Sequence, residues 1–174
     1  MIRQQTVRSA EDERFMSRAL ELARLGRGRT SPNPPVGAIV VSRGEVIGEG
    51  WHRKAGTPHA EIHALTQAGS RALGAALYVT LEPCCHKNKR TPPCVDAVLL
   101  SGVSRVVVSA VDPNPRVRGK AITRPRRAGI EVAAVVEDDT DLIRIADDVV
   151  VRYHNPVRPH DDAGAERVLD ARRG

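Results

Sequence analysis

The chain has 174 residues and a formal net charge of +6, a size typical of one domain with its own hydrophobic core. Phe, Trp and Tyr make up 2% of the residues, so the aromatic platforms on which single-stranded nucleic acid stacks are nearly absent. The sequence has no secretory signal and no run of eighteen apolar residues that could span a membrane. We therefore expect a cytoplasmic protein without a membrane partner, for which nucleic acid is a disfavoured ligand.

Helical and strand-like patterns alternate along the chain. A flexible leader at 1–10 precedes an amphipathic helix that Ser9 could cap, and Gly44 marks the turn of a hairpin. Residues 118–128 have no clear assignment, because Pro125 would kink or break a helix there. In chain order, we expect a helix at 11–25, strands at 36–41 and 45–50, a helix at 60–68, a strand at 77–81, a helix at 93–101 and strands at 105–110 and 130–136.

This alternation predicts the α/β class. We expect a three-layer α/β/α domain with a central mixed sheet of about five strands and helices on both faces. The domain is predicted at 11–150, followed at 151–174 by a charged tail that is expected to be mobile.

The three cysteines lie within eleven residues, 84 to 94. This spacing favours metal binding over a disulfide framework and is typical of a reducing compartment. One imidazole, from His59, and two thiolates could fill three of the four positions around a tetrahedral zinc ion. Two of Cys84, Cys85 and Cys94 are needed. Cys94, at a predicted helix start, is favoured together with one of the adjacent pair, and the remaining thiol could simply be packed in the core.

Glu61 follows His59 by two residues, at the start of a predicted helix. Zinc lowers the pKa of a coordinated water to about 7, and a nearby carboxylate can carry that water's protons. These groups suit the hydrolytic removal of ammonia from an amidine-like carbon of a heterocycle. The polar, cationic segment 85–91 is predicted to recognise the substrate, since a cation there could bind a phosphate.

Eight short motifs follow one another along the chain. They are Thr30-Ser31-Pro32-Asn33-Pro34 with Val36-Gly37-Ala38, Gly48-Glu49-Gly50-Trp51-His52, Ala55-Gly56, Pro58-His59-Ala60-Glu61, Tyr78-Val79-Thr80-Leu81-Glu82-Pro83-Cys84, Arg90-Thr91-Pro92-Pro93-Cys94, Asp112-Pro113-Asn114-Pro115 and Ala128-Gly129-Ile130-Glu131-Val132. In this order they closely resemble the pyrimidine deaminase domain of the riboflavin-biosynthesis deaminase/reductase family, the RibD family. The resemblance covers about residues 11–136, most of the chain.

The resemblance implies a cytidine-deaminase-like fold with one catalytic zinc ion, bound by His59, Cys84 and Cys94, and with Glu61 as the proton shuttle. The implied reaction converts 2,5-diamino-6-(5-phosphoribosylamino)pyrimidin-4(3H)-one to 5-amino-6-(5-phosphoribosylamino)uracil and ammonia. The resemblance also implies six residues that line the substrate pocket, with Arg90 well suited to the ribose phosphate. They are Asn33, His52, His86, Arg90, Asp112 and Asn114.

The sequence departs from the family pattern at several points. The segment between Cys84 and Cys94 is one residue longer than usual, and Cys85 stands where a serine is usual. No reductase domain or glycine-rich phosphate loop is found after Val136, so we expect no NADPH, and a separate reductase as a possible partner. We also expect a homo-oligomer.

Several alternatives to this interpretation remain. The enzyme could act on another nucleobase, nucleoside or aminopyrimidine, including a tRNA adenosine or a substrate of specialised metabolism. The chain could also belong to another class, as a catalytically silent zinc-binding partner of a separate reductase. Such a partner would not need Glu61. Asn33, Asp112 and Asn114 could instead shape proline-rich turns, and His52 could be a core residue.

Overall fold

The computed structural model of the chain describes residues 9–85, 93–112 and 119–134. Most of the predicted leader and all of the predicted tail lie outside these ranges. No helix in the described ranges has the length and apolar character needed to cross a membrane. The elements are α1 (Ala10–Arg24), β1 (Gly37–Ser42), β2 (Glu45–Trp51), α2 (Ala60–Ala68), the 3-10 helix η1 (Gly69–Ala72), β3 (Ala76–Leu81), α3 (Cys94–Leu100), β4 (Arg105–Ala110), α4 (Lys120–Arg127) and β5 (Glu131–Ala134).

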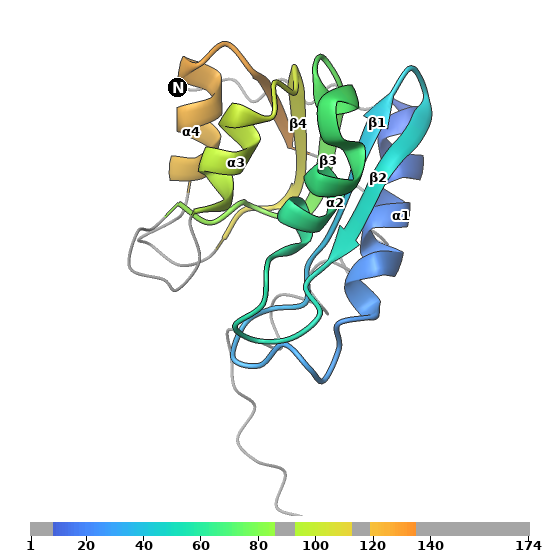
Figure 1. Ribbon diagram of the computed structural model, residues 1–174, viewed down its shortest axis with the longest axis vertical. Helices are drawn as coiled ribbons and strands as arrows, with labels where there is room; N and C mark the ends of the chain where they lie inside the picture. The colour runs from blue at the N-terminus through green and yellow to red at the C-terminus, as the bar shows by residue number, and fades with distance from the viewer. Residues whose placement is uncertain (1–8, 86–92, 113–118, 135–174) are drawn as a thin grey trace, which may run out of the picture.

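The strands form one five-stranded mixed sheet in the order β2-β1-β3-β4-β5. Strand β1 pairs antiparallel with both β2 and β3, whereas β3, β4 and β5 run parallel to one another. Helix α1 covers one face of the sheet, and α2, α3 and α4 lie on the other face (Figure 1). The prediction of a three-layer α/β/α fold with a mixed sheet of about five strands is therefore confirmed.

The sheet is buried on both faces by aliphatic side chains. Along β3, Leu77 and Val79 belong to the core cluster on the α2 and α3 side, whereas Tyr78 between them packs with α1. Successive side chains of a strand point to opposite faces, so a strand covered on both sides consists almost entirely of apolar residues. The continuous apolar runs in the sequence predicted this arrangement correctly.

A buried carboxylate joins α1 to the sheet. The Ser9 Oγ accepts a hydrogen bond from the Asp12 N–H at 3.1 Å, which confirms the predicted helix cap. The Asp12 side chain accepts hydrogen bonds from Arg105 at 2.6 and 3.0 Å and from the Tyr78 hydroxyl at 2.7 Å. Burial alone would raise the pKa of Asp12, but the hydrogen bonds from Arg105 and Tyr78 outweigh burial, so this pKa is lowered.

Helix α2 lies directly against β2, because two glycines of β2 leave room for its backbone. A Cβ atom at Gly48 would lie 2.2 Å from the Ala64 carbonyl oxygen. At Gly50 it would lie 2.4 Å from the Ala60 carbonyl oxygen and 2.5 Å from the His63 Cβ. These distances are far below van der Waals contact, so glycine at both positions sets how closely the first turns of α2 approach the sheet.

The segment that the sequence left unassigned forms the helix α4, with Pro125 inside it. Gly119 precedes the helix in a left-handed conformation, with φ of 75°, which glycine adopts without steric cost. Pro125 is buried, and its carbonyl oxygen accepts the N–H groups of Ala128 and Ile130, both at 3.0 Å. The proline therefore lies near the end of a short helix and helps to turn the chain into β5, instead of breaking a longer helix.

Candidate active site

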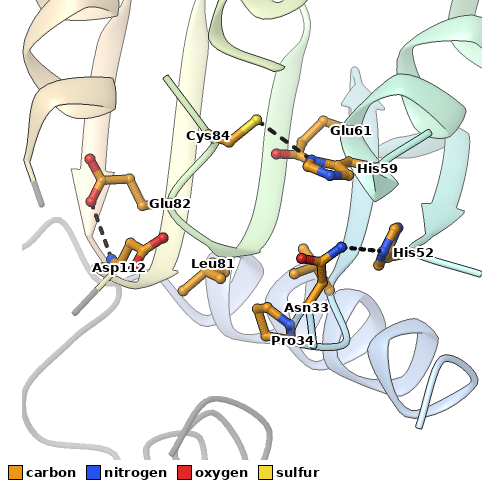
Figure 2. A pocket seen from close by; sticks show the side chains of 10 residues that line it. Asn33, Pro34, His52, His59, Glu61, Leu81, Glu82, Cys84 and Asp112 are labelled. Carbon is orange, nitrogen blue, oxygen red and sulfur yellow. Dashed lines mark hydrogen bonds between the residues drawn. The ribbon is translucent and has the colours of Figure 1, made fainter. Parts of the chain in front are cut away.

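A pocket opens at the edge of the sheet where β3 and β4 end, the position at which open α/β sheets bind ligands. It encloses about 440 Å³, including its open mouth. Figure 2 shows its lining side chains, which come from the connections around the strands and from the start of α2. They are Asn33, Pro34, Val36, His52, His59, Glu61, Leu81, Glu82, Cys84 and Asp112.

Three nitrogen and sulfur donors converge at this pocket. His59 immediately precedes α2, Cys94 is the first residue of α3, and Cys84 follows the end of β3. The His59 Nδ1 lies 3.1 Å from the Cys94 Sγ and 3.6 Å from the Cys84 Sγ. All three atoms lie within 4.8 Å of one another. The structure thus groups Cys84 and Cys94 with His59, whereas Cys85 is not a member of this group.

The donor set fits a zinc ion. Zn–N bonds of about 2.0 Å and Zn–S bonds of about 2.3 Å at a tetrahedral angle place a ligand nitrogen about 3.5 Å from a ligand sulfur. The observed separations, 3.1 and 3.6 Å, lie on either side of this value. One histidine and two cysteines also leave one tetrahedral position open, as catalytic zinc sites require.

The hydrogen bond between the two thiols shifts their pKa values in opposite directions. The Cys94 thiol donates a hydrogen bond to Cys84, and this bond is the main reason why the pKa of Cys84 falls to about 3. The same bond raises the pKa of Cys94. The Cys94 backbone N–H also donates to the Cys84 Sγ, at 3.3 Å. A cysteine whose pKa is lowered, beside an imidazole and a second thiol, is an environment in which a divalent cation can replace thiol protons.

Glu61 lies beside this group in the first turn of α2. Its side chain is 3% exposed, and its Oε2 has no hydrogen-bond partner among the described residues. Burial is the main cause that raises the pKa of Glu61, and the nearby His59 opposes it. A buried carboxylate oxygen without a partner, beside a metal-type donor set in a pocket, is suited to accept and return a proton.

A hydrogen-bonded chain fixes the orientation of Asn33. Its Nδ2 lies 3.4 Å from the His52 Nε2, and the His52 Nδ1 lies 3.4 Å from the Pro58 carbonyl oxygen. The amide nitrogen and the carbonyl oxygen have fixed roles as donor and acceptor, so His52 is the neutral tautomer that carries its proton on Nδ1. The Asn33 amide therefore turns its nitrogen toward His52, and in Figure 2 its oxygen points away from that ring.

Glu82 is a pocket residue that sequence reasoning did not single out. Its buried carboxylate accepts backbone N–H groups from Asp112 at 3.2 Å and from Gly119 and Ala121, both at 3.0 Å. Burial raises the pKa of Glu82, and these hydrogen bonds oppose that rise. A charged residue directly after a buried strand, inside the motif Thr80-Leu81-Glu82-Pro83-Cys84, was the available signal.

The structure brings seven of the predicted site residues to this region of the fold. The other three lie outside the described residues, so their roles stay predictions. The first set is Asn33, His52, His59, Glu61, Cys84, Cys94 and Asp112, and the second is His86, Arg90 and Asn114.

Residues 9–110, more than half of the chain, match the model of the cytidine and deoxycytidylate deaminase zinc-binding region. The chain is 56% identical over 123 residues to the riboflavin biosynthesis protein RibD of Escherichia coli, covering 71% of this chain and 33% of that protein. It is 50% identical over 122 residues to the diaminohydroxyphosphoribosylamino-pyrimidine deaminase of Buchnera aphidicola from Schizaphis graminum, covering 70% of this chain and 82% of that protein.

Among solved structures, the Acinetobacter baumannii RibD superposes with a TM-score of 0.76 at 45% identity, over 82% of this chain and 39% of that one. The chain thus spans about a third of the length of the RibD proteins it matches and most of the length of the shorter Buchnera deaminase. Together with the fold and the His/Cys/Cys group, these matches place the chain in the zinc-binding cytidine and deoxycytidylate deaminase family, with the deaminase domains of the RibD proteins.

Proposed function

We propose that the chain is a zinc-dependent hydrolase that deaminates 2,5-diamino-6-(5-phosphoribosylamino)pyrimidin-4(3H)-one to 5-amino-6-(5-phosphoribosylamino)uracil. The carbon–nitrogen bond to one amino group breaks, the oxygen of water becomes the new carbonyl oxygen, and ammonia leaves. The observation that carries this proposal is the buried, unpartnered Oε2 of Glu61 beside the His59, Cys84 and Cys94 donors. The identity to the Buchnera deaminase supports the choice of substrate.

In this proposal His59, Cys84 and Cys94 hold the metal ion. Zinc at this site supplies Lewis acidity, which lets a water molecule act as a nucleophile near neutral pH. Glu61 accepts a proton from the attacking water at its Oε2 and delivers protons to the ring nitrogen and to the departing amine. Burial of its side chain, which is 3% exposed, excludes bulk water from this exchange.

The remaining pocket residues orient the heterocycle. Asn33, held by His52, would accept an N–H group of the substrate with its amide oxygen, and the Asp112 carboxylate lines the same pocket. The Asn33 amide oxygen and the Asp112 carboxylate oxygens accept hydrogen bonds and donate none, which suits a ring that carries several amino groups. We propose Arg90 for the ribose phosphate, and His86 and Asn114 as further contacts, from the sequence resemblance alone.

The direct test is incubation of the purified, zinc-loaded chain with the diaminopyrimidine phosphate, with ammonia release and loss of an amino group by mass spectrometry as the measurements. Cytidine and tRNA serve as comparison substrates. We expect ammonia from the diaminopyrimidine phosphate and none above background from the other two. Release from tRNA or cytidine instead would favour the alternative deaminases, and zinc binding without ammonia release from any of them would favour a silent binding partner.

Several expectations stay predictions under this proposal. They concern the supply of a reductase by another polypeptide, the absence of NADPH, assembly into a homo-oligomer and a cytoplasmic location. The limits of the domain, at 11–150 between a leader and a tail, also stay a prediction.

A further inference from the structure

The Glu82 carboxylate is enclosed by backbone donors. Its side chain is 3% exposed, and three N–H groups point at its two oxygens. The Asp112 and Gly119 N–H groups both bond to Oε2, and the Ala121 N–H bonds to Oε1. An ionised carboxylate accepts at both oxygens and donates at neither, so it is the side chain that satisfies three such donors at once.

These donors stand at the two ends of one connection. Asp112 follows the end of β4 and lines the pocket, whereas Gly119 and Ala121 belong to the start of α4. Glu82 itself belongs to the sheet, because its own N–H donates to the Ala110 carbonyl oxygen at 2.9 Å and so extends the pairing of β3 with β4. One rigidly held carboxylate therefore connects the exit of β4 with the beginning of α4.

The direction of the side chain separates Glu82 from the chemical centre. Figure 2 shows its carboxylate pointing away from His59 and Glu61, toward the backbone of Asp112, although Cys84 lies only two residues further along the chain. Glu82 and the predicted metal ligand Cys84 thus both follow the end of β3. The Glu82 side chain points away from the metal-type donors and contacts the backbone that forms a wall of the pocket.

We propose that Glu82 is a positioning residue for substrate binding: its carboxylate holds Asp112 and the start of α4 in place as one wall of the pocket. The proposal rests on the proposed function, since it assigns to Asp112 a contact with the substrate. Glu82 acts through Asp112 and takes no part in proton transfer. Its removal is expected to weaken substrate binding and to leave the chemical step almost unchanged.

The kinetic test uses Glu82→Gln, which keeps the volume but replaces one accepting oxygen with a donating NH₂ group that faces a backbone N–H. Loss of a hydrogen bond to a charged group corresponds to about a tenfold rise in KM. We expect this rise with kcat changed by less than about threefold and with unchanged zinc content. The matched control is Asp12→Asn, which removes another buried, hydrogen-bonded carboxylate on the opposite face of the sheet and should lower the melting temperature without changing KM.

A double variant tests whether Glu82 acts through Asp112. With Asp112→Ala already in place, Glu82→Gln should raise KM by less than about twofold further, because the residue that it positions has lost its side chain. An unchanged KM in the single variant, or the full tenfold rise in both backgrounds, would overturn the proposal. If Glu82→Gln does not fold, Glu82→Asp replaces it with the same criteria, since it keeps both accepting oxygens on a shorter side chain.

Amide hydrogen exchange gives a readout that does not depend on activity. In Glu82→Gln, the amides of Asp112, Gly119 and Ala121 should exchange faster than in the wild type, and in Asp12→Asn they should not. Equal exchange in the wild type and Glu82→Gln would refute the positioning role even if KM changes. A wild type that releases no ammonia from the diaminopyrimidine phosphate would refute the proposed function, and the exchange rates would still decide whether Glu82 holds this wall.

Discussion

Replacement of Glu61 by Gln separates catalysis from folding at this site. The substitution keeps the shape of the side chain and removes its ability to accept and return a proton. The Glu61 Oε2 has no hydrogen-bond partner among the described residues, so the amide that replaces it breaks no hydrogen bond at that atom. The variant should therefore fold and bind zinc as the wild type does.

We expect the substitution to lower the reaction rate strongly and to leave the free energy of unfolding equal or slightly higher. A positioned general acid–base group contributes about 10²- to 10⁴-fold in rate, or about 2.7 to 5.5 kcal/mol in activation free energy. Burial raises the pKa of Glu61, which means that the folded state disfavours its ionised form. A neutral side chain removes this cost, so the free energy of unfolding should stay equal or rise by up to about 1 kcal/mol.

The assay compares ammonia release under single-turnover conditions, zinc content and melting temperature in the wild type and in Glu61→Gln. The matched control is Glu49→Gln, which neutralises a carboxylate paired with Arg18 at the surface and should retain full activity. If Glu61→Gln keeps more than about a tenth of the wild-type rate, Glu61 is not the proton shuttle. If it loses zinc or unfolds, the conclusion that its Oε2 is dispensable for the fold is wrong.

Three further predictions concern the packing of α2, the metal ligands and the pair of Asp12 with Arg105. Gly50→Ala should push α2 away from β2, lower the free energy of unfolding by about 1–3 kcal/mol and reduce kcat, as thermal denaturation and initial rates will show. Cys84→Ser should abolish tight zinc binding in metal analysis, whereas Cys85→Ser should retain it; the reverse result would exchange their roles. The folded-state pKa of Asp12 is lowered, so the contribution of its pair with Arg105 is present above about pH 4 and is lost as the pH falls through the folded-state pKa. Asp12→Asn should therefore unfold more easily near neutral pH, and its melting temperature should fall less steeply with acid than that of the wild type; parallel curves would contradict this reasoning.

Local patterns predicted the elements well because each pattern reports on its own residues. The strand predicted at 105–110 has these bounds in the structure, and the Ser9 cap forms as expected. The pattern left 118–128 unassigned, because a proline in a helix interior removes a hydrogen-bond donor and clashes with the preceding turn. In the structure Pro125 lies in the last turn of the eight-residue α4, and its carbonyl oxygen accepts the N–H groups of Ala128 and Ile130 as the chain turns into β5.

The candidate site was predictable to the extent that its chemistry depends on residue type. Histidine, cysteine and glutamate at the observed spacing indicated a hydrolytic zinc site, but the choice between Cys84 and Cys85 needed the direction in which each side chain leaves the turn after β3. For Glu82 the sequence offered only its place, as a charged residue directly after a buried strand, and not its role. Its partners are the backbone groups of residues 30 to 39 positions further along the chain, and backbone N–H groups carry no sequence signature.

The walls of the pocket come from four separate connections at one edge of the sheet. Asn33 precedes β1, His52 follows β2, Glu82 follows β3 and Asp112 follows β4. The core that stabilises the fold is built from other residues, further along the same strands. Mutations in these connections can therefore reshape the pocket without disturbing the core, and they act on two coupled pairs, Asn33 with His52 and Asp112 with Glu82. For the evolution of the family, and for directed evolution in the laboratory, this makes the recognised heterocycle a property that can drift in small steps while the core stays intact.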